Sequence, residues 1–254
     1  MRKFMELFQF DPLKALFVGV ERECFLTNSQ GAIVPIAAQV LSRLSQYNGR
    51  FGYELSACQL EERVGPCRLA ELHDHLIAND QILKTLEREL GFSRIHSEVG
   101  PNDMPLDIYP DPSGRYQKIT QNMPKPVLLA ACQIIGTHVH IGMPDHDTAL
   151  RVYNQVVSQC DFLCKNGSSS NGLRLSIYRT VAPYCDPKQF TDWCEFFKTA
   201  FTNGFDKNPR NCWNLIRISV HGTIEFRMFG ASPSLEKVVA WASLCHGLCA
   251  TAMA

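Results

Sequence analysis

The stretch Gly136–Gly142, with the sequence GTHVHIG, constrains the fold more than any other part of the chain. It follows an apolar run and predicts a β-strand with glycine at both ends. Side chains two residues apart in a strand share a face, so His138 and His140 point the same way while the alternate apolar residues face the core. An isolated His-x-His pair is explained equally well by two hydrogen-bonded histidines and by a metal or phosphate site.

Three other segments place polar side chains at the same two-residue spacing. They are 17–26, with Glu21 and Glu23; 59–61, with Glu61 and, upstream, Glu54; and 221–229, with Thr223, Glu225 and Arg227. A solvated sheet face would explain any one of these strands. Four strands that each combine core residues with carboxylate, imidazole or guanidinium groups indicate instead a polar cavity on one face of a sheet.

The rest of the chain mixes helical and strand patterns. Predicted helices cover 36–46, 68–90, 147–165, 187–202 and the residues from 234 onward. Predicted strands cover 15–27, 49–54, 57–64, 92–99, 213–220 and 223–229. Helices separate some strands and short turns join others, which favours an α+β fold with a curved, mostly antiparallel sheet. Helices would cover one face of this sheet and leave the other as a ligand funnel.

Two irregular segments interrupt this pattern. Residues 100–114 contain four prolines and predict a loop that lines a functional site. Residues 166–172 predict a polar, flexible loop ahead of Arg174 and Arg179. No repeat or domain boundary is visible, so we expect a single catalytic domain over residues 1–254.

Composition excludes several classes of partner. Lys plus Arg and Asp plus Glu each number 25, and without a basic block a nucleic-acid partner is not expected. No apolar run approaches the roughly 18 residues of a membrane helix, and the N-terminus lacks the pattern of a secretory signal. We therefore expect a cytoplasmic protein without a membrane partner, whose eleven cysteines are free thiols.

Five motifs occur together in a specific order, at 18–23, 59–61, 114–116, 136–142 and 221–227. Through them the chain resembles glutamate–cysteine ligase family 2, also called the carboxylate–amine ligases, over about residues 16–250. The resemblance implies a glutamine-synthetase-like fold whose sheet forms a funnel for ATP, a divalent metal and glutamate. It also implies ATP-dependent formation of a γ-glutamyl amide from glutamate, or a similar carboxylate, and an amine such as cysteine.

The resemblance also implies roles for individual residues. By position, the metal-binding set would be Glu21, Glu23, Glu54, Glu61, His138 and Glu225. Arg227 would meet the nucleotide phosphate and act in catalysis together with Glu61. The expected substrate-binding residues are His140, Arg174 and Arg179. Mg²⁺, or alternatively Mn²⁺, suits such a set because hard cations take carboxylate oxygens and accept one imidazole.

The chain departs from the family pattern at several positions. Ala57 stands where relatives often carry an acidic residue, Gly230 follows the E-F-R motif where many have Asp, and 168–171 replaces a Ser-Pro-aromatic element. Two alternatives stay open: a nucleotide- or metal-binding relative that has lost turnover and acts in regulation, and a metal-dependent hydrolase. The sequence does not determine the amine acceptor or the oligomeric state, a homo-oligomer included.

Overall fold

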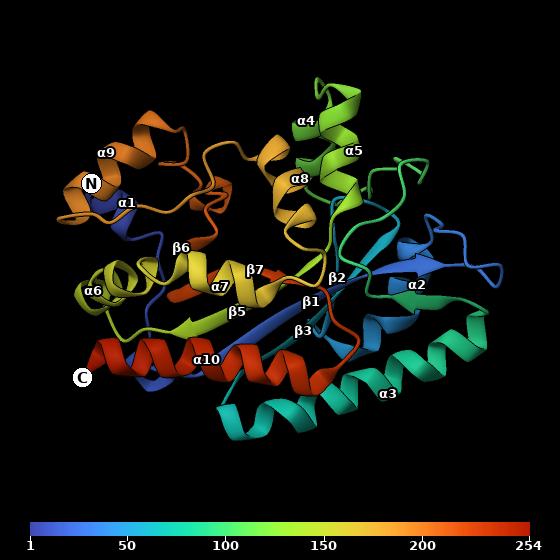
Figure 1. Cartoon of the computed structure of the whole chain (residues 1–254), viewed down its shortest axis with the longest axis horizontal. Helices are drawn as coiled ribbons and strands as arrows, with labels where there is room; N and C mark the ends of the chain where they lie inside the picture. The colour runs from blue at the N-terminus through green and yellow to red at the C-terminus, as the bar shows by residue number, and fades with distance from the viewer.

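The chain folds around one seven-stranded sheet with helices on both sides (Figure 1). The structure, a computed structural model, describes residues 1–254. The strands are β1 (Val18–Thr27), β2 (Phe51–Tyr53), β3 (Gln59–Cys67), β4 (Ser93–Ile95), β5 (Gly136–Gly142), β6 (Ile216–Ser219) and β7 (Thr223–Gly230). Their order is β2-β3-β1-β5-β7-β6, with β4 beside β1, and every pair is antiparallel. The expected α+β class with an antiparallel sheet is therefore confirmed.

The strand register brings the polar positions of different strands together. Directly paired residues are Glu23 with Glu61, Glu21 with His138, His140 with Glu225, and Glu225 with Arg217. Paired residues of neighbouring antiparallel strands have Cβ atoms only about 5 Å apart. The register thus gathers acidic and basic side chains in neighbouring rows on one face of the sheet.

Helices cover the apolar face of the sheet. They are α3 (Leu72–Leu90), α6 (His146–Val157), α7 (Cys160–Gly167) and α10 (Leu235–Met253), of which α3 and α10 run along the lower side of Figure 1. Between sheet and helices lies a core that includes Val20, Val139 and Phe226, each almost completely buried. Burying one such side chain contributes about 1.5–3 kcal/mol. The apolar half of each strand's alternation therefore determines which face carries the polar side chains.

The remaining helices lie at the other face and at the ends of the sheet. They are α1 (Arg2–Met5), α2 (Ala37–Leu44), α4 (Arg115–Thr120), α5 (Lys125–Gln133), α8 (Leu173–Val181) and α9 (Trp193–Thr202). Four 3-10 turns are η1 (Pro12–Lys14), η2 (Ser45–Tyr47), η3 (Leu69–Glu71) and η4 (Pro209–Asn211). In Figure 1, α4, α5 and α8 stand on the side of the sheet opposite to α3 and α10.

Several predicted boundaries were wrong for identifiable reasons. The helix expected over 147–165 is two helices, because α6, which packs on β6 and β7, ends at Val157, and α7, which packs on β7, begins at Cys160. The helix expected from 187 begins at Trp193, where the Asp192 side chain caps it by accepting from the Glu195 amide. The strand expected over 92–99 is limited to β4, which pairs with only the last residues of β1. Helices α5 and α8 were not predicted.

Two properties of the whole chain bear on the alternatives left open by the sequence. None of the helices is both long and apolar enough to cross a membrane. The sheet is antiparallel and is not a barrel of repeated strand–helix units. The metal-dependent hydrolase alternative rested on the His-x-His strand, which such enzymes usually carry in a barrel of that kind, so the observed sheet does not support it.

Candidate active site

A cavity of about 1110 Å³ opens on the sheet face that α3 and α10 leave uncovered. Its floor is made by the polar residues of β1, β3, β5, β6 and β7, and its walls include residues of α4 and α8. Nine of the ten candidate site residues line it, namely Glu21, Glu23, Glu54, Glu61, His138, His140, Arg174, Glu225 and Arg227. The tenth, Arg179, does not.

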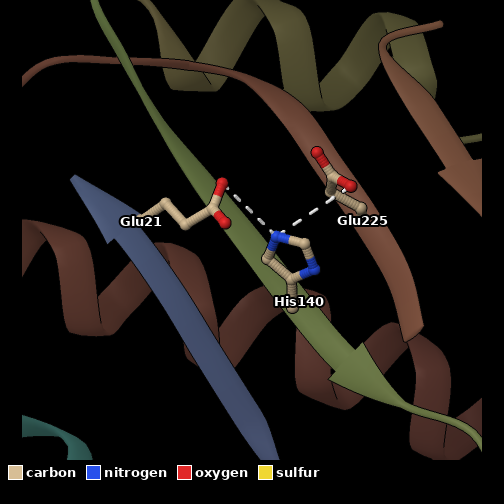
Figure 2. Close-up of side chains that lie close together, drawn as sticks. All are labelled: Glu21, His140 and Glu225. Atoms are coloured by element: carbon tan, nitrogen blue, oxygen red, sulfur yellow. Dashed lines mark ion pairs between the residues drawn. The ribbon is translucent and has the colours of Figure 1, made fainter. Parts of the chain in front are cut away.

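The first cluster at the floor consists of Glu21, His140 and Glu225, from three adjacent strands (Figure 2). His140 Nε2 lies 3.6 Å from Glu21 Oε2 and 3.9 Å from Glu225 Oε2. The other ring nitrogen, Nδ1, lies 2.9 Å from Thr223 Oγ1, which fixes the plane of the imidazole. Nε2 is buried and has no hydrogen-bond partner, although a buried polar nitrogen normally has one.

The second cluster consists of Glu23, Glu54 and Glu61, whose carboxylate oxygens lie within 4.8 Å of one another. Glu23 Oε2 accepts a hydrogen bond of 2.6 Å from the backbone amide of Gly136, and Glu61 is paired with Arg63. Glu54 directly follows β2, the strand at one edge of the sheet, and lines the cavity. Three carboxyl groups at this distance repel one another unless a proton or a cation lies among them.

His138 lies between the two clusters. Its Nδ1 is 3.1 Å from Glu21 Oε2 in the first cluster, and its Nε2 is 3.7 Å from Glu23 Oε1 in the second. The sequence interpretation placed His138 among the metal ligands and His140 at the substrate. The geometry instead places His140 inside a three-residue cluster, and His138 bridges two carboxylates.

The pKa of Glu21 in the first cluster is shifted down, whereas the pKa values of Glu54 and Glu61 in the second cluster are shifted up. Burial acts to raise the pKa of Glu21, but His140 and His138 hold it well below its usual value. Burial and the charge of Glu23 raise the pKa of Glu54 to about 7, and burial with nearby carboxylates raises the pKa of Glu61 well above its usual range. The second cluster therefore retains a proton near neutral pH, which a bound cation would displace.

Two arginines hold the carboxylate of Glu225. Arg227 Nη1 donates to Oε1, and Arg217 Nε donates to Oε2 at 2.7 Å. Burial acts to raise the pKa of Glu225, but Arg217, His140 and Arg227 together keep it far below its usual value. Glu225 is thus ionised over the whole physiological range.

Arg174 is buried in the cavity wall. Its Nε donates to the Ile135 carbonyl at 2.7 Å, and Nη1 donates to the carbonyls of Arg227 and Met228 at 3.4 and 3.3 Å. A side chain at Gly136 would collide with this guanidinium. Arg174 therefore ties β5 to β7 through the backbone, and its terminal nitrogens are engaged by carbonyls.

Arg179 lies outside the cavity, contrary to the expectation that it binds substrate. It is about half exposed, and its Nη2 lies 2.9 Å from Asp186 Oδ1 on the surface. The cause is that residues 173–181 form helix α8 and not a loop. Two residues five apart on a helix point about 140° away from each other, so Arg174 and Arg179 cannot face one ligand.

The loop before α8 is held in place by a single carboxylate. Glu98 is almost completely buried and accepts hydrogen bonds from the hydroxyl groups of Ser168, Ser169 and Ser170. It also accepts from the backbone amides of Ser169 and Ser170. The loop that the sequence indicated as flexible is thus fastened next to the cavity wall.

The sequence interpretation missed Arg63 and Arg217, which both line the cavity. Both show the two-residue spacing that identified the predicted site residues. Arg63 lies two residues after Glu61, and Arg217 lies between Ile216 and Ile218. Strand alternation was applied to Arg227 but not to these two arginines.

Comparisons with known proteins place the chain in a family. Residues 17–159, more than half of the chain, match the family described as glutamate–cysteine ligase family 2. The chain belongs to glutamate–cysteine ligase family 2. It is 27% identical over 207 residues to a protein of Gloeobacter violaceus whose name provisionally assigns it as glutamate–cysteine ligase 2. It is 26% identical over 273 residues to a similarly named protein of Leifsonia xyli.

These matches differ in how much of each protein they cover. The first covers 75% of this chain and 55% of its relative, and the second covers 96% and 69%. The chain thus spans about half the length of several family 2 relatives that it matches. A crystal structure of a bifunctional glutathione synthetase from Pasteurella multocida aligns with a TM-score of 0.62, at 13% identity, over 91% of this chain and 38% of that one. At this identity the likeness shows a shared fold.

The divalent metal implied by family 2 can be tested against the side chains. The unpartnered Nε2 of His140 faces two carboxylate oxygens at 3.6 and 3.9 Å. Ligand atoms bound to one Mg²⁺ at 2.0–2.1 Å lie about 3 Å apart, so small side-chain movements would suffice. The second cluster offers three carboxylates within 4.8 Å. The residues present therefore fit hard divalent cations.

Proposed function

We propose that this chain carries the catalytic sheet of an ATP-dependent carboxylate–amine ligase that forms a γ-glutamyl amide. The observation that supports it most is the pair of carboxylate clusters, one with an unpartnered histidine nitrogen, on the floor of a single cavity. Its substrates would be ATP, glutamate or a similar carboxylate, and an amine such as cysteine. The metal would be Mg²⁺ or Mn²⁺.

The chemistry explains why such a site needs carboxylates and arginines together. A carboxylate reacts with an amine at neutral pH only after one of its oxygens becomes a leaving group, and transfer of the γ-phosphoryl group of ATP makes an acyl phosphate. Both reactants are anions, and bound divalent cations would offset their repulsion. The protein must hold the cations, orient the acid and stabilise charge on the transferring group.

The described residues can divide these tasks. Glu21, His140 and Glu225 would hold one cation, and Glu23, Glu54 and Glu61 would hold another. Arg227 is buried beside Glu225 and over the Trp213 ring, and it would stabilise charge on the phosphoryl group. Arg174 would keep β5 and β7 at the separation that places His140 and Arg227.

An ADP-release assay with Mg²⁺, ATP and glutamate, repeated with a panel of amines that includes cysteine, tests the proposal. We expect ADP release that needs both the acid and one amine. Hydroxylamine in place of the amine should yield a hydroxamate, because it traps an acyl phosphate. Stabilisation against heat by Mg²⁺–ATP without any ADP release would select the binding relative that has lost turnover.

A further inference from the structure

Glu98 is a buried carboxylate that the proposed division of tasks does not use. The residue is only 3% exposed, and all the donors to its side chain are neutral. Ser168 Oγ and Ser169 Oγ donate at 3.1 and 2.8 Å, the amides of Ser169 and Ser170 donate at 2.5 and 3.1 Å, and Ser170 Oγ donates as well. Burial acts to raise the pKa of this carboxyl, but the hydrogen bonds from the three serines hold it below its usual value. Glu98 is therefore an anion at neutral pH.

Glu98 also contacts the ends of two strands. Its backbone carbonyl accepts a hydrogen bond of 3.2 Å from the amide of Ile135, the residue before β5. At the end of β7, a Cβ on Gly230 would collide with Glu98 Oε1, so a carboxylate in this place requires a glycine there. Glu98 thus lies where the loop before α8, the start of β5 and the end of β7 meet.

Bonds lead from this carboxylate to the wall and to the floor of the cavity. On the wall side, Ser170 Oγ donates to Glu98 and accepts from the backbone amide of Arg174 at 3.2 Å, in the first turn of α8. On the floor side, the amide of Gly136, the first residue of β5, donates to Glu23 Oε2 at 2.6 Å. Arg174 lines the cavity wall and Glu23 belongs to the second cluster, so Glu98 is connected to both.

We infer that Glu98 is a positioning residue for the second cluster, because its carboxylate holds the amino end of α8 against the start of β5 and thereby orients Glu23. An anion suits this place, since the free amides at the start of a helix carry partial positive charge. Arg174, carried on that helix, donates to the Ile135 carbonyl at 2.7 Å, and this bond fixes the backbone from which the Gly136 amide reaches Glu23. The inference rests on the proposed function in taking the second cluster as a cation site.

A purely structural role for Glu98 makes a different prediction. Loss of its carboxylate would then lower the free energy of unfolding and leave the cation sites of the folded protein unchanged. If Glu98 orients Glu23, its replacement weakens cation binding at the second cluster of the folded protein, while the first cluster keeps its affinity. Cation affinities measured at a temperature where every variant is folded therefore distinguish the two roles.

The test is calorimetric titration with Mn²⁺ of wild type and two variants that change the carboxylate in different ways. Glu98→Gln removes its charge and keeps its size, and Gly230→Ala displaces it without changing its chemistry. Gly247→Ala on α10 is the matched control, because a Cβ at that position would meet no neighbouring segment within 4 Å. Glu61→Gln identifies the titration step that belongs to the second cluster.

We expect Glu98→Gln and Gly230→Ala to weaken the second-cluster step by about 10- to 100-fold, the loss typical when a hydrogen-bonded partner that orients a metal ligand is changed. The other step should change by less than about threefold, and Gly247→Ala should match wild type. Hydrogen exchange over residues 168–174 should become faster in the first two variants, because the amides of Ser169 and Ser170 lose their acceptor.

Glu98→Asp is the milder variant and carries the test where Glu98→Gln does not fold. It keeps the charge with one methylene less, so a smaller loss at the same titration step is expected.

Three results would overturn the inference. They are unchanged Mn²⁺ affinity in the folded variants of Glu98 and Gly230, equal weakening of both titration steps, and a wild type without any Mn²⁺ step that Glu61→Gln weakens. The titrations need no turnover, so absence of ADP release with both Mn²⁺ steps present would count against the ligase proposal and leave the positioning role of Glu98 standing.

Discussion

Glu61 and Glu62 are neighbours on β3, and both are almost completely buried, yet they belong to different environments. Glu61 faces the cavity and lies within 4.8 Å of two other carboxylates. Glu62 points to the helix-covered face, where its Oε2 is 3.3 Å from Arg22 Nε. Arg22 in turn lies 3.1 Å from His96 Nε2.

The difference between the two faces teaches how polar residues in one sheet acquire separate roles. On the covered face, Glu62 has a dedicated basic partner, so the protein balances its own charge. On the cavity face, Glu61 is paired with Arg63 but also lies against Glu23 and Glu54, and a proton or cation has to balance the remaining carboxylates. The first arrangement maintains the fold, and the second is suited to binding ligands.

The largest effect is expected when the buried ion pair of Arg22 and Glu62 is broken. Arg22→Met should lower the free energy of unfolding by about 3–5 kcal/mol, because it leaves Glu62 buried without a partner. The double variant Arg22→Met with Glu62→Leu should recover most of that loss, since no charge is then buried. Urea denaturation at neutral pH measures both. A double variant no more stable than the single one would contradict this account.

Glu225→Gln probes the cavity face. We expect Mn²⁺ affinity to fall by about 10- to 100-fold, because an amide is a poorer ligand than a carboxylate for a hard cation. Titration calorimetry measures it, with the exposed Glu89→Gln as control. Equal Mn²⁺ affinity in wild type and Glu225→Gln would remove Glu225 from the metal site.

His96, which contacts Arg22, allows the comparison to be tested through the pH dependence of stability. Burial, with the charges of Arg22 and Arg94 and against that of Asp80, lowers its pKa to about 3 from an ordinary value of 6.5. Between these values the unfolded chain binds a proton that the folded chain does not, so stability is lost as the pH falls. In His96→Gln, the decline of unfolding free energy below about pH 6 should be shallower by about 1.4 kcal/mol per pH unit.

Denaturation curves at several pH values measure this slope in both proteins. Carboxyl groups that titrate in the same range affect both proteins equally, so the difference isolates His96. Parallel curves would show that His96 is protonated in the folded protein.

The smallest expected effect concerns Arg179. Since its only ion pair is with Asp186 at the surface, Arg179→Ala should change stability by less than about 1 kcal/mol. It should also leave the apparent KM for glutamate within about fivefold of wild type. Steady-state kinetics over a range of glutamate concentrations test this. A selective rise of that KM would return Arg179 to the substrate site.

The sequence by itself determined which side chains share a strand face. The two-residue period of β-strands is local covalent geometry, so the facing of Glu21 with Glu23, and of Glu225 with Arg227, could be predicted. The apolar alternate residues also predicted which face would be covered. The α+β class with an antiparallel sheet could be predicted because helices separate some strands and short turns join others.

Only the tertiary structure decided which strands pair and which residues stand opposite one another. Strand order and register come from long-range pairing, so the sequence could not show that His140, and not His138, lies between Glu21 and Glu225. A helix in place of a loop turned Arg179 toward solvent. Arg217 gained its position from pairing with Glu225 across β6 and β7, a contact set by the register of two whole strands.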